Sequence, residues 1–297
     1  MKLIRSYGMR VFLLAALCLA LVFALLGCGT GSGANVQQGA KLMQKASFEG
    51  GTAYRTADDI YWVLSLSGSW KEMGRQYGSL VADDLKEFHD AITQDIVSRG
   101  MDKDTLLRTS EEFTDSLNDN MRELMQGMSE TSGLTYGQIQ QLNAGMIILP
   151  GQLFGDQTPS ACSGIAVWGN YTADGKLIFG RNWDMDRAGM EKYMKYLAVV
   201  VYNPNSGSSF ADVHPLGNIY PETGLNERGL FLEINNGTES DSQCYADREN
   251  SVAVLAEALN KCSTVNEATD YIGNIPADMS YIIQVASPEN CVSIERP

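Results

Sequence analysis

Two apolar runs joined by an Asp-Gly turn constrain the fold of this 297-residue chain more than any other feature. The first run, 163–168, follows Cys162, and the second, 177–182, ends just before Asp184. Apolar and β-branched residues favour extended strands, and the Asp-Gly pair between the runs favours the positive φ angles of a hairpin turn. The pattern therefore predicts a β-hairpin whose return strand brings Arg181 and Asp184 back beside Cys162.

This hairpin is expected to place three chemically reactive side chains together. A guanidinium near a thiol lowers the pKa of the thiol, and a carboxylate orients a nearby amine or proton carrier. Cys162, Arg181 and Asp184 are therefore candidate catalytic residues. The structural alternatives are a buried inert cysteine, a surface ion pair and a turn carboxylate.

A cysteine that attacks an amide needs a base, and neither histidine in the sequence has a supporting motif. His89 falls in a predicted helix, and His214 precedes Pro215 in a stretch that we expect to be irregular. A cysteine at a chain N-terminus solves the problem differently, because its own α-amino group, with a reference pKa of about 7.7–8.0, accepts the thiol proton. This solution requires cleavage of the Ala161–Cys162 bond.

Two ordered sequence blocks carry a resemblance to a known family. The first is Cys-Ser-Gly at 162–164 with Asp-Gly-Lys-Leu-Ile-Phe-Gly-Arg-Asn-Trp-Asp at 174–184. The second is Gly-Leu-Asn-Glu-Arg-Gly-Leu at 224–230, followed by Glu-Ile-Asn-Asn at 233–236. Together they resemble linear amide C–N hydrolases of the N-terminal-nucleophile superfamily, which includes choloylglycine hydrolases, C45 acyltransferase-like proteins and acid ceramidase relatives. A further block at 68–78 is similar to the pro-segment of C45-type members.

The resemblance implies a fold, a reaction and a set of site residues. The fold would be an αββα sandwich preceded by a helical pro-segment. The activity would be hydrolysis of a linear non-peptide amide of the N-acyl amide class, without a cofactor, after autoproteolysis before Cys162. Cys162 would be the nucleophile, Arg181 and Asp184 would assist it, and the side-chain amide of Asn236 would stabilise the oxyanion. Asn236 and Asn235 point to opposite faces of a strand, so only one of them can serve.

Three other functions remain open at this stage. One is a non-catalytic surface lipoprotein that keeps the fold as a binding module. Another is an acyltransferase of the C45 type, because the family contains both hydrolases and acyl-transfer enzymes. The last is a papain-like hydrolase that pairs Cys162 with His214. The identity of the N-acyl amide is not indicated by any residue.

The N-terminus has the pattern of an exported bacterial lipoprotein. Basic residues at positions 2, 5 and 10 precede an uncharged stretch, 11–26, and Leu-Leu-Gly-Cys ends at Cys28. A membrane-spanning anchor is the alternative, but this stretch is shorter than the roughly 20 residues that cross a bilayer. We expect a signal peptide at 1–27, a lipidated Cys28 on the outer face of the membrane, and a flexible tether at 28–55.

The remaining chain reads as an α+β protein in two segments. Residues 56–161 contain one short strand, 60–66, and then helical periodicity, which predicts the helical pro-segment. Residues 162–297 alternate between strand and helix patterns and would form the catalytic domain. The family's later strands and a Thr-Asn pair have no counterpart after Cys162, so we expect this domain to be incomplete at its C-terminus.

Composition excludes several other classes of function. A net charge of −14 argues against nucleic-acid binding, because phosphates would be repelled. Two histidines and the lack of a Cys-x-x-Cys motif argue against a zinc site, and no Walker-type loop supports nucleotide hydrolysis. Cys244, Cys262 and Cys291 are an odd set, so a disulfide between two of them leaves one free. The oligomeric state is not indicated.

Overall fold

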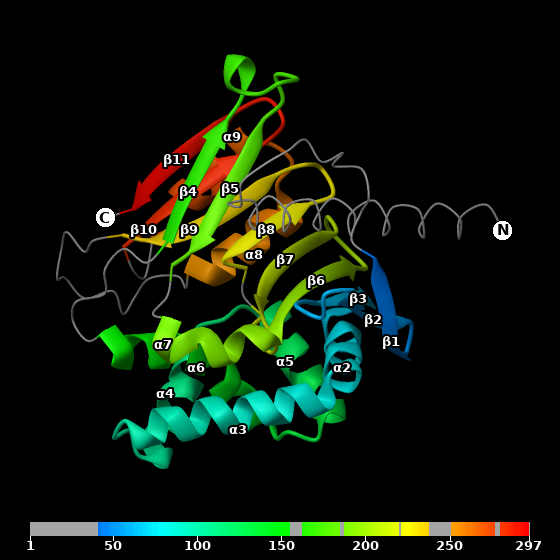
Figure 1. Ribbon diagram of the computed structural model, residues 1–297, viewed down its shortest axis with the longest axis vertical. Helices are drawn as coiled ribbons and strands as arrows, with labels where there is room; N and C mark the ends of the chain where they lie inside the picture. The colour runs from blue at the N-terminus through cyan, green and yellow to red at the C-terminus, as the bar shows by residue number, and fades with distance from the viewer. Residues whose placement is uncertain are drawn as a thin grey trace.

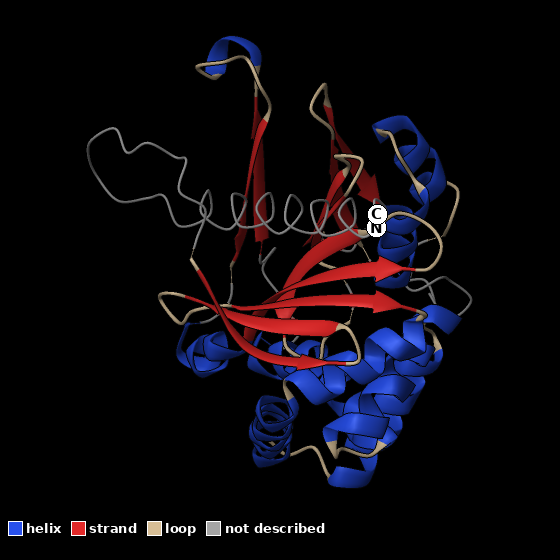
Figure 2. Ribbon diagram, turned by 90° about the vertical axis from the view of Figure 1, so that its right-hand side faces the viewer, coloured by secondary structure: helices blue, strands red, loops and turns tan. Residues whose placement is uncertain are grey.

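The computed structural model describes residues 41–154, 162–184, 187–219, 221–237, 251–276 and 280–296. These residues form a mixed α+β fold built around a nine-stranded sheet. Helices cover one face of this sheet, and a two-stranded hairpin lies over the other (Figures 1 and 2). The predicted α+β class is therefore confirmed.

The nine-stranded sheet is antiparallel except at one pair of strands. In spatial order its strands are β1 (Leu42–Phe48), β2 (Gly51–Thr56), β3 (Trp62–Gly68), β6 (Leu197–Pro204), β7 (Phe210–Pro215), β8 (Thr223–Asn226), β9 (Phe231–Asn236), β10 (Tyr281–Ala286) and β11 (Cys291–Arg296). The exception is the parallel pair β3 and β6. Because β3 precedes Cys162 in the chain and β6 follows it, both predicted segments share one sheet.

The helices lie mainly between the third and fourth strands of the chain and again near its end. They are α2 (Trp70–Leu80), α3 (Ala82–Ser98), α4 (Lys103–Asp115), α5 (Asp119–Ser132), α6 (Tyr136–Phe154), α7 (Arg187–Met190), α8 (Ser251–Lys261) and α9 (Val265–Gly273). Short 3₁₀ turns occupy Gly169–Tyr171 and Glu191–Tyr196. A capping box begins α2, since Ser69 and Glu72 cap the helix reciprocally.

Two stretches with helical periodicity are each divided into two helices, and a later helix contains a proline. The apolar stripe that runs from Trp70 onward is divided at Val81, whose φ of −133° separates α2 from α3. The next stripe is also divided, because the Asn118 side chain caps a new helix at the Met121 N–H. Helix α6 contains Pro150 and continues through it to Phe154.

The helix-covered face carries the main apolar core. Large side chains from the helices and strands are fully buried there, including Tyr77, Phe88 and Tyr202. The backbones of α2 and α5 approach closely where each has a glycine. A Cβ on Gly74 would lie 2.1 Å from the Leu124 carbonyl oxygen, and one on Gly127 would lie 2.1 Å from the Lys71 carbonyl oxygen. The two helices can pack at this distance only without side chains at these positions.

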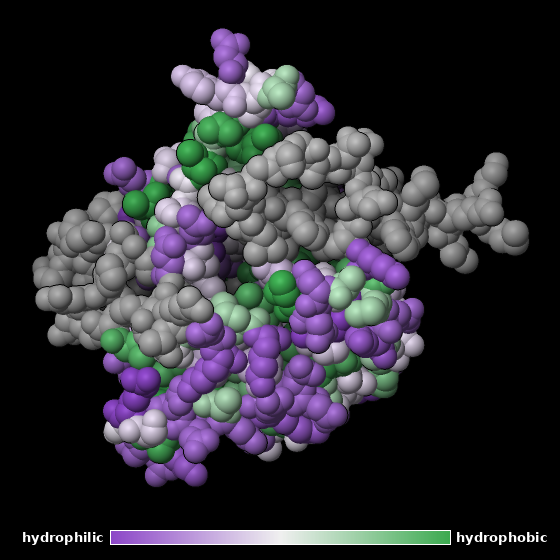
Figure 3. Space-filling view, in the orientation of Figure 1, coloured by the Kyte–Doolittle hydropathy of each residue, from purple (hydrophilic) through white to green (hydrophobic). Residues whose placement is uncertain are grey.

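The opposite face carries a smaller apolar cluster under a hairpin of β4 (Cys162–Val167) and β5 (Ile178–Trp183). Phe179 of the hairpin packs on Phe231 of β9 with ring centroids 4.5 Å apart. The outward face of the hairpin remains open, and Ile165 is 64% exposed. Figure 3 shows hydrophobic surface over this hairpin below its hydrophilic tip.

The structure corrects the predicted tether. Residues 42–55 of the predicted 28–55 tether belong to the β1–β2 hairpin. Ala53 of β2 is buried, and Arg75 of α2 forms a 2.7 Å ion pair with Glu49 in the turn. The segments 56–161 and 162–297 are joined in one sheet, because β3 and β6 exchange backbone hydrogen bonds.

The predicted signal peptide at 1–27 and the lipidation site Cys28 lie outside the described residues. Among the residues that are described, no helix combines the length and hydrophobicity needed to cross a bilayer. In the described residues, the layer over the hairpin-facing side of the sheet is the β4–β5 pair itself.

Candidate active site

Strand alternation in the hairpin decides which side chains face the large sheet. Cys162 pairs with Trp183, and Gly164 pairs with Arg181. Because side chains alternate along a strand, Cys162, Gly164 and Arg181 all point toward β9, whereas Ser163 points outward. The hairpin and the adjacency of Cys162 and Arg181, both predicted from the sequence, are confirmed.

Arg181 links the thiol to the large sheet. Its Nη2 lies 3.3 Å from Cys162 Sγ and also donates a 2.7 Å hydrogen bond to the Ile234 carbonyl oxygen. Its Nε donates a 2.8 Å hydrogen bond to Glu233 Oε2. The Arg181 and Glu233 side chains are 7% and 0% exposed, respectively. The guanidinium is therefore held in one position beside the sulfur by groups on β9.

Two glutamates complete the charged surroundings of the thiol, and sequence reasoning gave neither a role. Glu233 lies in the middle of β9 and accepts a 2.8 Å hydrogen bond from Asn235 Nδ2. Glu222, just before β8, places Oε2 3.8 Å from Arg181 Nη2. A charged residue inside the otherwise apolar run 230–234 was the available signal for Glu233. Glu222 had no such signal, because only the tertiary fold brings it to Arg181.

The structure favours Asn235 over the predicted Asn236 as the site asparagine. Ile234 belongs to the core beneath the helices, and Asn236, two residues later, shares that side of β9. Its partner on β10, Tyr281, also belongs to that core. Asn235 instead shares the hairpin-facing side with Glu233, to which it is hydrogen-bonded. The predicted Asn236 therefore lies on the side of β9 away from the hairpin, because strand register decides the face.

Asp184 follows the last residue of β5 and is exposed. Its Oδ2 accepts a 3.2 Å hydrogen bond from Ser163 Oγ, so the carboxylate lies next to the residue that follows Cys162. Its backbone N–H is a hydrogen-bond donor to the thiol, and this interaction lowers the pKa of Cys162. Asp184 therefore lies at the predicted end of the hairpin, and Ser163 is an additional neighbour that the sequence interpretation did not include.

The net effect of these surroundings on the thiol is the reverse of the predicted one. Burial is the largest influence, and it raises the pKa of Cys162 to about 11 from an ordinary 9.0. The Arg181 guanidinium lowers this pKa, whereas the Glu222 and Glu233 carboxylates raise it. The cation favours the thiolate as expected, but burial and the two carboxylates outweigh it. The thiol is therefore neutral at physiological pH and needs a base to react.

Neither described histidine is directed at this thiol. His214 lies on β7 and not in an irregular stretch; its Nε2 is 3.0 Å from Asp212 Oδ1, and its Nδ1 is 2.8 Å from the Pro215 carbonyl oxygen. Both members of the Asp212–His214 pair are buried. Burial lowers and Asp212 raises the pKa of His214, with a net increase. Since His214 Nδ1 faces the Pro215 carbonyl and Nε2 faces the Asp212 carboxylate, the papain-like pairing of Cys162 with His214 is not formed.

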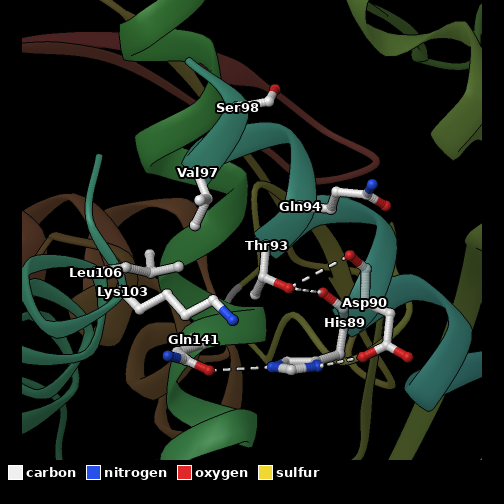
Figure 4. A pocket seen from close by; sticks show the side chains of 9 residues that line it. All are labelled: His89, Asp90, Thr93, Gln94, Val97, Ser98, Lys103, Leu106 and Gln141. Atoms are coloured by element: carbon white, nitrogen blue, oxygen red, sulfur yellow. Dashed lines mark hydrogen bonds and ion pairs between the residues drawn. The ribbon is translucent and has the colours of Figure 1, made fainter. Parts of the chain in front are cut away.

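The other histidine lines a groove in the helical layer. His89 of α3 contacts Gln141 Oε1 at 3.0 Å and Asp90 Oδ1 at 3.1 Å, and the groove has a volume of about 520 Å³ (Figure 4). Lys103 and Leu106 also line it. This groove belongs to the helices, whereas Cys162 lies over the opposite face of the sheet. His89 is therefore not a base for the thiol.

The described residues form neither a disulfide nor a metal-ligand cluster. Cys262 and Cys291 are free, whereas Cys244 lies outside the described residues. The described part of the chain contains no cluster of three or more His, Cys, Asp or Glu side chains arranged to hold a metal ion.

A search of protein-family models finds no match to this sequence, and no curated protein is significantly similar to it.

Proposed function

We propose that this chain is a cysteine hydrolase of linear non-peptide amides that becomes active when its backbone is cleaved before Cys162. The proposal includes the αββα architecture of N-terminal-nucleophile hydrolases and membership of that superfamily. The observation that carries it is the 3.3 Å contact between Arg181 Nη2 and Cys162 Sγ, with Arg181 anchored by buried Glu233. A cation fixed beside a strand-terminal thiol is suited to covalent catalysis.

The elevated thiol pKa favours a base supplied by the cysteine itself. After cleavage, the α-amino group of Cys162 would lie on the same residue as the sulfur and would accept its proton. Its reference pKa of about 7.7–8.0 suits proton transfer near neutral pH. Asp184, which is held beside the adjacent Ser163, would accept a hydrogen bond from the resulting ammonium. No histidine is required in this scheme.

The reaction would proceed through an acyl-enzyme. The thiolate attacks the amide carbonyl carbon, and the carbonyl electrons move to oxygen, which Arg181 and the Asn235 amide would stabilise. The C–N bond then breaks, and the Cys162 ammonium returns its proton to the departing amine. Water attacks the thioester and releases the carboxylic acid, with the same amine as base. The initial chain cleavage would use the same thiol in an N-to-S acyl shift from the Ala161 carbonyl, followed by hydrolysis.

Hydrolysis of N-acyl amides tests this function. Purified protein is incubated with a panel of N-acyl amides that share one acyl group, and the released acid and any acyl adduct on the protein are measured by mass spectrometry. We expect turnover and an adduct on the peptide that begins at Cys162. Both should be lost in Cys162→Ala and retained in Cys291→Ala, a second free cysteine. Turnover that survives Cys162→Ala would reject the proposal, whereas binding without turnover would favour a binding module.

The export of the protein is a separate proposal. We infer from the leader and the Leu-Leu-Gly-Cys sequence that Cys28 carries lipid and attaches the protein to the outer face of a membrane. Labelling with a fatty-acid analogue should mark the wild type and not Cys28→Ala. Equal labelling of both would contradict the assignment.

A further inference from the structure

The charges around Cys162 do not balance, and this imbalance bears on the substrate. Arg181 is the one cation that the described residues place at the thiol, whereas Glu222 and Glu233 both lie within 4 Å of its guanidinium. Asp184 adds a third carboxylate at the end of the hairpin. Among the described residues, the site therefore has more negative than positive groups.

The two glutamates beside Arg181, Glu222 and Glu233, are not equivalent. Glu233 is fully enclosed and is hydrogen-bonded to both Arg181 and Asn235. Glu222 approaches Arg181 at 3.8 Å, which is beyond hydrogen-bond distance, and its side chain is 31% exposed. Glu233 therefore uses its oxygens to hold the site together, whereas the Glu222 carboxylate remains available to a ligand.

The position of Glu222 relates it to the bond that would be broken. Arg181 Nη2 lies 3.3 Å from the sulfur and 3.8 Å from Glu222 Oε2, so a single guanidinium nitrogen separates the two groups. A substrate whose carbonyl carbon is at the sulfur would have its next few atoms within reach of this carboxylate. Burial raises the pKa of Glu222, and Arg181 and His214 only partly offset the increase. An added positive charge or hydrogen-bond donor at this point would therefore be favourable.

We propose that Glu222 selects substrates by the charge of the part that leaves as an amine, which is a cationic or neutral hydrogen-bond donor and not a carboxylate or sulfonate. This inference rests on the proposed amidase function. An anionic group would face the Glu222 and Asp184 carboxylates, and Arg181 is already ion-paired with Glu233. Repulsion between like charges is strongly unfavourable in a partly buried site. N-acyl diamines and N-acyl ethanolamines fit this description, whereas N-acyl glycine and taurine conjugates do not.

Three amides that share a lauroyl group test the charge selection. They are N-lauroyl ethylenediamine, which is cationic, N-lauroyl ethanolamine, which is neutral, and N-lauroyl glycine, which is anionic. We expect kcat/KM for the cationic and neutral amides to exceed that for the glycine conjugate by at least about tenfold. Glu222→Gln should reduce this ratio severalfold. Asp174→Asn, which removes an exposed carboxylate at the hairpin tip, is the matched control and should leave the ratio unchanged.

A second measurement separates this inference from the proposed function. The same amides are tested at equilibrium for protection of Cys162 from alkylation, which needs no turnover. Charge-dependent protection that is lost in Glu222→Gln supports the selection even if no amide is cleaved, in which case the amidase proposal fails. The inference is overturned if the glycine conjugate protects or reacts as well as the other two. It is also overturned if Glu222→Gln leaves the order and size of the preferences unchanged.

Discussion

The two faces of the nine-stranded sheet are built from different kinds of residue. Against the helices lie large apolar side chains such as Phe88 and Tyr202, with the α2–α5 contact packed backbone to backbone. Against the β4–β5 hairpin lie a small apolar cluster and the Arg181–Glu233 ion pair. Burying ions has a desolvation cost that apolar packing does not have. The comparison indicates that the helix-covered face supplies stability and that the hairpin-covered face holds the reactive group.

The largest effect is expected from breaking the ion pair on the hairpin-covered face. Arg181→Gln leaves Glu233 buried without its cation, which should lower the free energy of unfolding by about 3–5 kcal/mol. Urea denaturation measures this change. Replacing both residues with methionine should recover much of the loss, because no unpaired charge then remains. Lys176→Gln, in an exposed pair on the same hairpin, should not change stability.

An unchanged urea midpoint in Arg181→Gln would contradict the assignment of a buried, charged pair to this face. If the double-methionine variant loses as much free energy of unfolding as Arg181→Gln, the lost stability would come from side-chain packing and not from the unpaired charge.

The next effect concerns how the hairpin sits on the sheet. A Cβ on Gly164 would lie 2.4 Å from both Glu233 Oε1 and Gln284 Oε1. Gly164→Ala should therefore lift β4 off β9 and reduce amidase activity about 100-fold, because small displacements of a nucleophile have effects of that size. The unfolding free energy should change less than the activity, since the helix-covered core is untouched.

Gly180→Ala is the control on the outward face of the same hairpin. Its added Cβ meets Ile165 at an ordinary 3.6 Å, so near-normal activity is expected. Equal losses from the two alanine variants would show that the hairpin is sensitive to any change and not to contact with the sheet.

The helix-covered face should respond in the opposite way. Gly74→Ala places a Cβ 2.1 Å from the Leu124 carbonyl oxygen and should cost about 1–3 kcal/mol of stability. Activity per folded molecule should remain close to normal well below the melting temperature. Gly273→Ala at the end of α9, where a Cβ meets nothing, should be tolerated. Calorimetry measures the stability of both variants, and parallel assays measure their activity. A catalytic defect in fully folded Gly74→Ala would contradict the proposed difference between the two faces.

The smallest effect is on the titration of the thiol. In the intact chain, iodoacetamide should react slowly near pH 7 and increasingly as the pH rises toward 11, because the raised pKa of Cys162 disfavours the thiolate. Glu222→Gln should move the midpoint down and Arg181→Gln should move it up, because the carboxylate disfavours the thiolate and the guanidinium favours it. Intact-mass measurement counts uncleaved molecules alone. Shifts in the opposite directions would mean that other charges control the thiol.

Much of the hairpin-covered face could be predicted from local sequence. Strand alternation and an Asp-Gly turn are short-range signals, and they placed Cys162 beside Arg181 correctly. The predicted Asn236 lies on the helix-covered side of β9, whereas Asn235 lies on the hairpin side. One residue of register reverses the face, and a short sequence motif does not specify register. Glu222 was missed for a different reason, since its approach to Arg181 exists only after β8 and β5 come together across the fold.

The helix-covered face was predicted in outline and missed in detail. Helical periodicity located the apolar stripes, but Val81 and Asn118 divide them by local backbone preferences that periodicity does not reveal. The β1–β2 hairpin was missed because residues 42–48 are mostly solvent-exposed and lack a strong apolar alternation. His214 was taken for a loop residue because Pro215 follows it, yet Pro215 is the last residue of β7.

Cleavage of the Ala161–Cys162 bond tests the central claim most directly. Intact-mass and N-terminal sequence measurements on the purified chain should find a new N-terminus at Cys162. It should appear together with amidase activity, be absent from Cys162→Ala, and form more slowly in Asp184→Asn. Uncut protein with full amidase activity would contradict the account, because the base for a neutral thiol of pKa about 11 would then have to come from another group.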